Sequence, residues 1–105
     1  VRFFIRGMDT VSLDTNTGTI SPKSWLHVVG VRNNNENTRA IYINGEESVV
    51  HRSDSGSPAG ATSAVFLNAS PHSGYYWPGR IDDVRVYNRI LYPWEVKGLY
   101  QFGNQ

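Results

Sequence analysis

The feature that most constrains the fold is the alternation of short β-branched and aromatic runs with clusters of Gly, Asn, Asp, Ser and Pro. β-Branched and aromatic side chains fit an extended, pleated backbone, whereas the punctuating residues favour turns. Short runs repeated in this way are typical of an antiparallel sandwich or barrel. The sequence therefore predicts an all-β fold with helix as a minor part.

The expected strands are 2–7, 11–13, 25–31, 39–46, 47–51, 64–68 and 79–87. Asn44 and Gly45 predict a two-residue hairpin turn, because both residues tolerate positive φ. The polar stretch 33–37 is expected to be a loop. A short helix is expected over 93–100, since Pro93 suits a first helical turn and Gly98 should limit its extension.

Composition narrows the partners and the chemistry. The chain of 105 residues has a net charge of +1 and no basic run, so nucleic acid is not an expected partner. No apolar stretch approaches the roughly 20 residues of a membrane-spanning helix, so no membrane insertion is expected. The absence of cysteine excludes disulfides, thiolate metal sites and a cysteine nucleophile. We expect a single domain over residues 1–105.

Three segments stand in the order and spacing of the laminin-G-like, concanavalin-A-type jelly roll. They are a Trp-x-His-Val strand at 25–31, a Tyr-x-Asn-Gly hairpin at 40–45, and a Gly-x-Ile-Asp-Asp-Val-Arg-x-Tyr strand at 79–89 followed by Leu91, Pro93, Glu95 and Tyr100. Together they resemble the family over about residues 20–100. The resemblance implies an antiparallel jelly-roll sandwich and a recognition domain of an extracellular or cell-surface protein.

The chain departs from the family in its length. Complete members are longer, and their amino-terminal strands have no counterpart before Val1. An incomplete jelly roll leaves unpaired strand edges and an uncovered apolar face, which favour association. We therefore expect either a fragment of a larger protein or a sandwich completed by a second chain in a dimer or other homo-oligomer.

One loop has the composition of a carbohydrate site. Aromatic faces pack against the C–H face of a sugar, while amide and imidazole groups bond its hydroxyls. The candidate ligand-binding residues are Asn68, His72, Tyr75, Tyr76 and Trp77. The alternative interpretation is that one or two of these rings cap the core at the end of the sheet.

Asp82 is the candidate metal ligand, because the resemblance implies that this aspartate sometimes donates an oxygen to calcium. Calcium takes about six to eight oxygen ligands, and the others would come from strands outside this chain. In the alternative interpretation, Asp82 and Asp83 bond neighbouring backbone N–H groups or Arg80 and Arg85. Adjacent residues of a strand face opposite sides, so the two aspartates are not expected to act as an acid/base pair.

The remaining aromatic and histidine residues have structural interpretations. Trp25 and Trp94 are expected in the core, and His27 is expected to be a hydrogen-bonded structural histidine. His51 and His72 have no cysteine partner and no regular spacing to another histidine, so zinc has little support.

Catalysis is not expected. Related glucanases on this fold carry Glu-x-Asp-x-x-Glu on one strand face, because retaining hydrolysis needs two carboxyl groups about 5 Å apart. No such run exists here, and Glu46 and Glu47 should splay after the Asn-Gly turn.

The leading hypothesis is a non-catalytic module that binds carbohydrate or glycoprotein. The alternative is a structural or assembly domain that self-associates through its sheet edges without a small ligand. A weaker third hypothesis is a fragment of a glycoside hydrolase whose catalytic carboxylates lie before Val1.

Overall fold

The computed structural model describes residues 2–3, 13–16, 23–52 and 79–103. They contain a three-stranded antiparallel sheet in the order β3-β4-β5, a two-stranded antiparallel sheet, β1-β2, and one helix. The elements are β1 (Arg2–Phe3), β2 (Leu13–Asp14), β3 (Val28–Asn33), β4 (Thr38–Ile43), β5 (Glu46–Arg52) and α1 (Pro93–Gly103). The described strands are part of an antiparallel all-β sandwich, as predicted.

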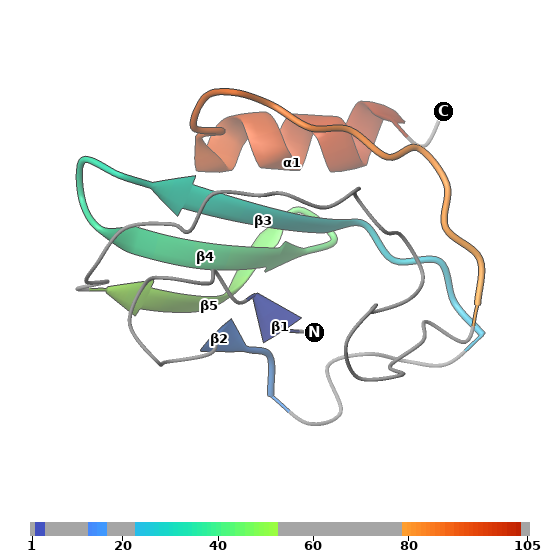
Figure 1. Cartoon of the computed structure of the whole chain (residues 1–105). Helices are drawn as coiled ribbons and strands as arrows, with labels where there is room; N and C mark the ends of the chain where they lie inside the picture. The colour runs from blue at the N-terminus through green and yellow to red at the C-terminus, as the bar shows by residue number, and fades with distance from the viewer. Residues whose placement is uncertain (1, 4–12, 17–22, 53–78, 104–105) are drawn as a thin grey trace, which may run out of the picture.

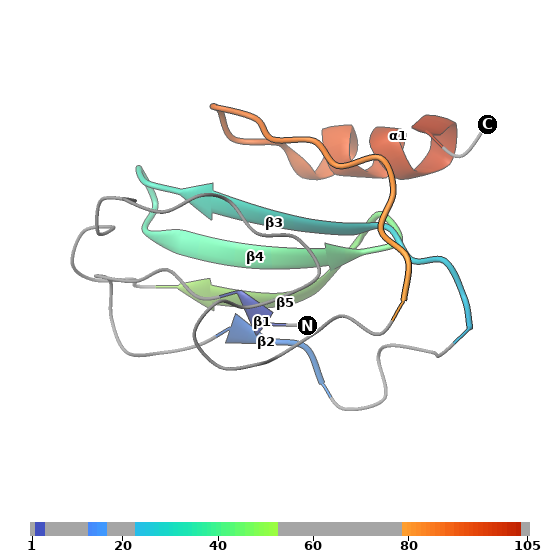
Figure 2. The same cartoon turned by 45° about the vertical axis from the view of Figure 1, so that its right-hand side comes forward.

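The central strand β4 is buried on both of its faces. Successive strand residues point to opposite sides, so Ala40 and Tyr42 share one face while Arg39 and Ile41 share the other. All four are buried, and Ile41 is 1% exposed. Helix α1 runs along one side of the β3-β4-β5 sheet, and β1 and β2 lie on the other side (Figures 1 and 2). Because β1 and β2 contact β4, the sheet is a middle layer.

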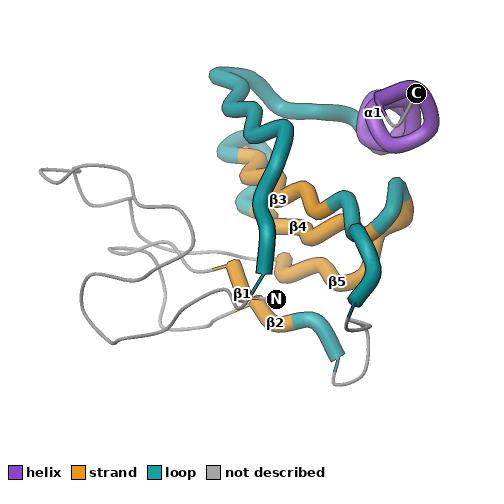
Figure 3. Tube along the Cα trace, turned by 90° about the vertical axis from the view of Figure 1, so that its right-hand side faces the viewer, coloured by secondary structure: helices purple, strands orange, loops and turns teal. Residues whose placement is uncertain are grey.

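The main core lies between the sheet and α1. Val96 is 0% exposed and packs with Leu91, Ala40 and Tyr42. Around this cluster are partly buried side chains from β3, β5 and the helix: Val29, Val31, Val50 and Leu99. Viewed along the helix axis, α1 lies apart from the strands as a separate layer (Figure 3). The side chains of the core cluster pack between the two layers. Burial of this apolar surface is what holds α1 on the sheet.

The β4–β5 hairpin has the predicted Asn-Gly turn. Asn44 and Gly45 have φ angles of 51° and 83°, and Ile43 pairs with Glu46 across them. Two central residues with positive φ are the pattern of a type I′ turn, whose twist matches that of the strands. Gly45 is also close to α1, because a Cβ there would lie 3.1 Å from Cδ2 of Tyr100.

The β3–β4 connection is the expected polar turn. The Asn33 side-chain oxygen accepts the backbone N–H groups of Asn35 and Glu36 at 3.0 and 3.1 Å, which is an Asx-type turn. Asn37 completes the reversal with a φ of 54°.

The prediction of a strand over 79–87 is wrong. No residue of this segment belongs to a strand, and within the described residues no strand pairs with it. Asp83 has a φ of 53°, a left-handed conformation that interrupts an extended chain. The Asp82 carboxylate, which accepts the Asp83 N–H at 2.8 Å, stabilises this kink.

Two predicted boundaries also differ. Strand β3 begins at Val28 rather than at Trp25, and α1 continues through Gly98 to Gly103. A Cβ at Gly98 would have no neighbour within 4 Å, so this glycine lowers helix propensity without creating a stop. Packing of Val96 and Leu99 outweighs that cost of about 1 kcal/mol.

Exposed apolar side chains are concentrated near the carboxyl end of the chain. Both faces of β4 are covered, whereas most of the exposed large apolar side chains of the described residues lie within 81–102, apart from Trp25 and Val28. Those in this range are Ile81, Val84, Val86, Tyr87, Tyr92, Trp94 and Phe102. Within the described part of the chain, no helix is long and apolar enough to cross a membrane.

Candidate functional site

The predicted ligand-binding residues Asn68, His72, Tyr75, Tyr76 and Trp77 lie outside the described residues. Their role stays a prediction.

Asp82 is exposed, and its carboxylate already accepts the neighbouring backbone N–H. Asp83 forms an ion pair with Arg85 at 3.0 Å, so the backbone and arginine contacts expected of this aspartate pair are present. Among the described residues, no three acidic or histidine side chains come together to hold a metal. Calcium needs about six oxygens, so the described residues alone do not fit it.

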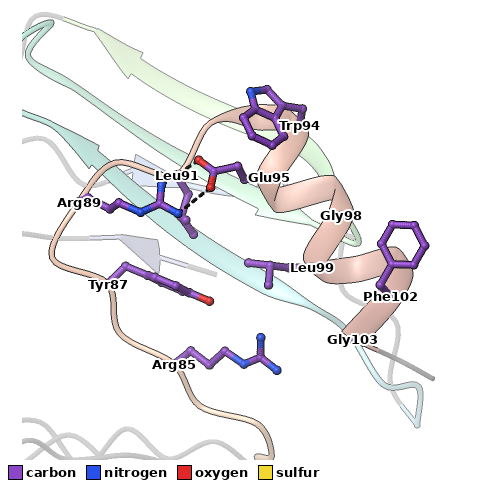
Figure 4. Close-up of a pocket in the computed structure, with 10 residues that line it drawn as sticks. All are labelled: Arg85, Tyr87, Arg89, Leu91, Trp94, Glu95, Gly98, Leu99, Phe102 and Gly103. Atoms are coloured by element: carbon purple, nitrogen blue, oxygen red, sulfur yellow. Dashed lines mark hydrogen bonds and ion pairs between the residues drawn. The ribbon is translucent and has the colours of Figure 1, made fainter.

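A groove lies between α1 and the segment that leads into it, residues 79–92. We call it the α1 groove; it is open and has a volume of about 630 Å³. Its lining includes Arg85, Tyr87 and Leu91 from the segment and Trp94, Leu99 and Phe102 from the helix. Figure 4 shows Tyr87 and Arg85 extending toward Leu99, with Trp94 and Phe102 at different turns of the helix. The lining is mainly apolar and rich in aromatic rings.

The charged side chains that line the α1 groove all have ion-pair partners. Arg89 donates two hydrogen bonds to the Glu95 carboxylate, at 2.9 and 2.6 Å. Arg85 donates to Asp83 at 3.0 and 3.2 Å. Each arginine of the lining is therefore neutralised by a carboxylate, Arg89 by Glu95 within the lining and Arg85 by Asp83 outside it.

Glu95 also fixes the start of the helix. Its carboxylate accepts the Tyr92 N–H at 3.1 Å, the backward bond of a capping box, and the Tyr92 carbonyl accepts the Glu95 and Val96 N–H groups. The hydrogen bonds from Arg89, and then the one from Tyr92, lower the pKa of Glu95 to about 2. The carboxylate is ionised at neutral pH and is not a proton donor there.

Trp94 is not a core residue, contrary to the sequence prediction. Its side chain is 73% exposed, because it lies two positions before Val96, about 200° around the helix from the buried face. The Trp94 and Tyr92 rings are stacked, with 6.4 Å between their centroids and 2° between their planes. The prediction for Trp25 is also wrong: it precedes β3 and is 67% exposed.

His27 lies where β3, the hairpin turn and α1 meet. Its backbone N–H donates to the Asn44 side chain at 2.9 Å, and its carbonyl accepts the Asn44 N–H at 2.8 Å. Its ring is 6.0 Å from that of Tyr100, and its buried Nδ1 has no hydrogen-bond partner among the described residues. Burial lowers the pKa of His27, Asp83 opposes this shift and Arg85 adds to it. The residue is structural, as predicted, but through its backbone and its packing rather than through Nδ1.

Sequence reasoning missed the α1 groove. The available signal was Glu95 at the third helical position, after Pro93 and with Arg89 six residues before it. Glu at that position indicates a capping interaction. The exposure of the aromatic rings near Glu95 depends on which face of the helix packs on the sheet. No local sequence pattern indicates which face that is.

Comparison with known proteins supports the fold. A crystal structure at 2.1 Å of an S-layer domain-containing protein (residues 221–444) from Clostridium thermocellum ATCC 27405 matches with a TM-score of 0.58 and 23% identity. The match covers 86% of this chain but 44% of that one, so this chain spans less than half the length of its structural neighbour. No curated protein matches significantly.

A laminin-G family model, described as the Concanavalin A-like lectin/glucanases superfamily, matches residues 2–97. This range includes the hairpin, the approach to α1 and the Arg89–Glu95 pair. The chain therefore belongs to the concanavalin A-like lectin and glucanase superfamily, as a laminin-G-like domain.

Proposed function

We propose that this domain is a non-catalytic recognition module that binds carbohydrate, free or as the glycan of a glycoprotein. The observation that carries the proposal is the α1 groove, which combines exposed aromatic rings with charges that neutralise each other. Sugars present apolar C–H faces and hydroxyl groups, and aromatic surfaces with a few fixed polar groups match both.

The charge pairing favours a neutral ligand. An acidic glycan would need an arginine that is not already bound to a carboxylate, whereas Arg85 and Arg89 are engaged by Asp83 and Glu95. Hydroxyl groups can still share these oxygens and guanidinium groups without breaking the pairs.

A non-catalytic role is consistent with the described carboxylates. Glu95 has a pKa of about 2 because it is bound to Arg89, and Glu46 pairs with Lys97 at 3.4 Å. Glycoside hydrolysis needs a protonated carboxylic acid beside a second carboxylate. Glu95, which is ionised at neutral pH, is not suited to the role of that acid.

We propose an extracellular or cell-surface location for the domain. Its structural neighbour is an S-layer domain-containing protein, and the superfamily description includes lectins. We retain the loop residues Asn68, His72, Tyr75, Tyr76 and Trp77 as a proposed second contact with the glycan, and calcium at Asp82 as a proposal that requires oxygens from outside the described residues.

A glycan array tests the proposal directly. The purified chain should bind a subset of neutral oligosaccharides in preference to acidic ones, and titration in solution should reproduce the order. A chain that is folded by circular dichroism but binds no glycan in either format would refute carbohydrate recognition.

The second candidate function is assembly through self-association without a small ligand. It is favoured by Val86, which is 92% exposed, and by Val84 and Ile81, which are 52% and 45% exposed in a segment without strand pairing among the described residues. Sedimentation over a range of concentrations tests it. A monomer at all concentrations contradicts this candidate, whereas an oligomer lost in a Val84→Ser and Val86→Ser double variant supports it.

A further inference from the structure

We infer that Trp94, held in place by Tyr92, is the surface on which a pyranose ring of a neutral glycan stacks at the end of the α1 groove. This inference rests on the proposed function and assigns it a site within the described residues. It uses residues other than the candidates predicted at 68–77.

The first argument is the geometry of the two rings. Trp94 and Tyr92 are parallel to within 2° and are 73% and 55% exposed. Exposed aromatic side chains that pack against nothing usually vary in orientation, whereas stacking on Tyr92 fixes the orientation of the indole plane. A pyranose ring needs such a flat apolar surface for its C–H face.

The second argument is that the backbone beneath the rings is fixed. The Tyr92 carbonyl accepts hydrogen bonds from the Glu95 and Val96 N–H groups at 2.9 and 3.0 Å. The Tyr92 N–H is bound by the Glu95 carboxylate, and Val96 is fully buried against the sheet. The two rings are thus attached to a firmly anchored helix start, and a preorganised surface loses less entropy on binding.

The third argument is the placement of polar groups. Trp94, Glu95 and Arg89 line the same groove, and Figure 4 shows the Arg89–Glu95 pair between the segment and the first turn of α1. Glu95 offers acceptors and Arg89 offers donors at fixed positions. A sugar stacked on Trp94 can direct its hydroxyl groups toward this pair. The donors of Arg89 and the acceptors of Glu95 match the hydroxyl groups of a neutral sugar.

Tyr92 acts as a positioning residue. Its ring orients the indole, and its backbone is part of the helix start. A phenylalanine at this position keeps the stack, so Tyr92→Phe should retain binding where Tyr92→Ala weakens it. Thermal unfolding of both variants is the control. If both are folded at the temperature of the binding assay, a role of Tyr92 in folding alone would not produce this difference in affinity.

The experiment uses the 105-residue chain and defined neutral probes: hexasaccharides of β-1,4-glucose, β-1,3-glucose, β-1,4-mannose and β-1,4-xylose, with an oligogalacturonate as the acidic comparison. Affinity is measured by calorimetry. Trp94→Ala should weaken binding of the preferred neutral probe about tenfold or more, and Trp94→Phe should weaken it less. Trp25→Ala is the matched control, because Trp25 is 67% exposed and outside the groove; it should bind like the unmodified chain.

Three results would overturn the inference, and they can be told apart. If a neutral probe binds Trp94→Ala as tightly as the unmodified chain, the site lies elsewhere and carbohydrate recognition stands; loss of binding in Tyr75→Ala, Tyr76→Ala or Trp77→Ala would then place it in the loop. If no neutral probe binds the unmodified chain, both proposals fail. If Trp94→Ala abolishes self-association instead of sugar binding, the aromatic pair is an interface between copies of the chain.

Discussion

Two valines allow the same substitution to be compared at buried and exposed positions. Val96 is 0% exposed between α1 and the sheet, and Val86 is 92% exposed on the segment before the helix. Val96→Ala removes two buried carbon atoms, which costs about 1.6 kcal/mol at ~0.8 kcal/mol per CH₂ group. The cavity left among Ala40, Tyr42 and Leu91 adds about 1 kcal/mol. The better helix propensity of alanine stabilises the variant by about 0.5 kcal/mol.

We therefore expect Val96→Ala to lower the free energy of unfolding by about 2 kcal/mol, which corresponds to a fall in Tm of roughly 8–16 °C for a domain of this size. Val86→Ala should change stability by less than about 0.5 kcal/mol. Urea unfolding followed by tryptophan fluorescence measures both, with equal m values required for the comparison. Equal destabilisation by the two variants would refute the placement of α1 on the sheet.

Three further predictions concern the hairpin, the helix start and His27. Gly45→Ala should destabilise the chain by about 2 kcal/mol, because Gly45 has a positive φ and the new Cβ would lie 3.1 Å from Tyr100. Gly98→Ala should stabilise the chain by about 0.5–1 kcal/mol in thermal unfolding, because its Cβ meets no neighbour. The reverse order of stability would contradict the hairpin packing. The pKa of Glu95 falls from 4.5 to about 2 on folding, so its contribution to the free energy of unfolding is complete above pH 4.5 and is lost as the pH falls toward 2. Glu95→Gln should therefore be less stable at pH 6 and should flatten the curve of stability against pH between these values. A curve unchanged by the substitution would refute the pairing with Arg89. The pKa of His27 is lowered by burial, so folding should weaken as the pH falls below about 6.5; an NMR titration that places this pKa above the unfolded value would refute the burial argument.

The parts of the fold that the sequence predicted correctly are those set by neighbouring residues. Asn44 and Gly45 form the expected turn because both accept positive φ, whatever surrounds them. The strand that runs into this turn and the polar turn after β3 follow from local patterns in the same way. The laminin-G-like resemblance also depended on short motifs that the sequence contains in full.

The candidate site was less accessible to sequence reasoning. The backbone and arginine contacts of Asp82 and Asp83 were anticipated, whereas the α1 groove and the exposure of Trp94 were not. Hydrophobic character alone suggested a core position for Trp94, but a tryptophan becomes buried only if its face of the helix meets the sheet. Val96 occupies that face instead.

The sequence by itself determined the turn positions, the strand pattern of the central hairpin and the presence of a helix after Pro93, because each depends on the conformational preferences of a few adjacent residues. Only the tertiary structure decided that 79–87 is not a strand and that Trp25 and Trp94 face outward. A strand exists only when a neighbouring backbone supplies its hydrogen bonds, and burial only when a second surface covers the side chain. Both depend on residues distant in the sequence.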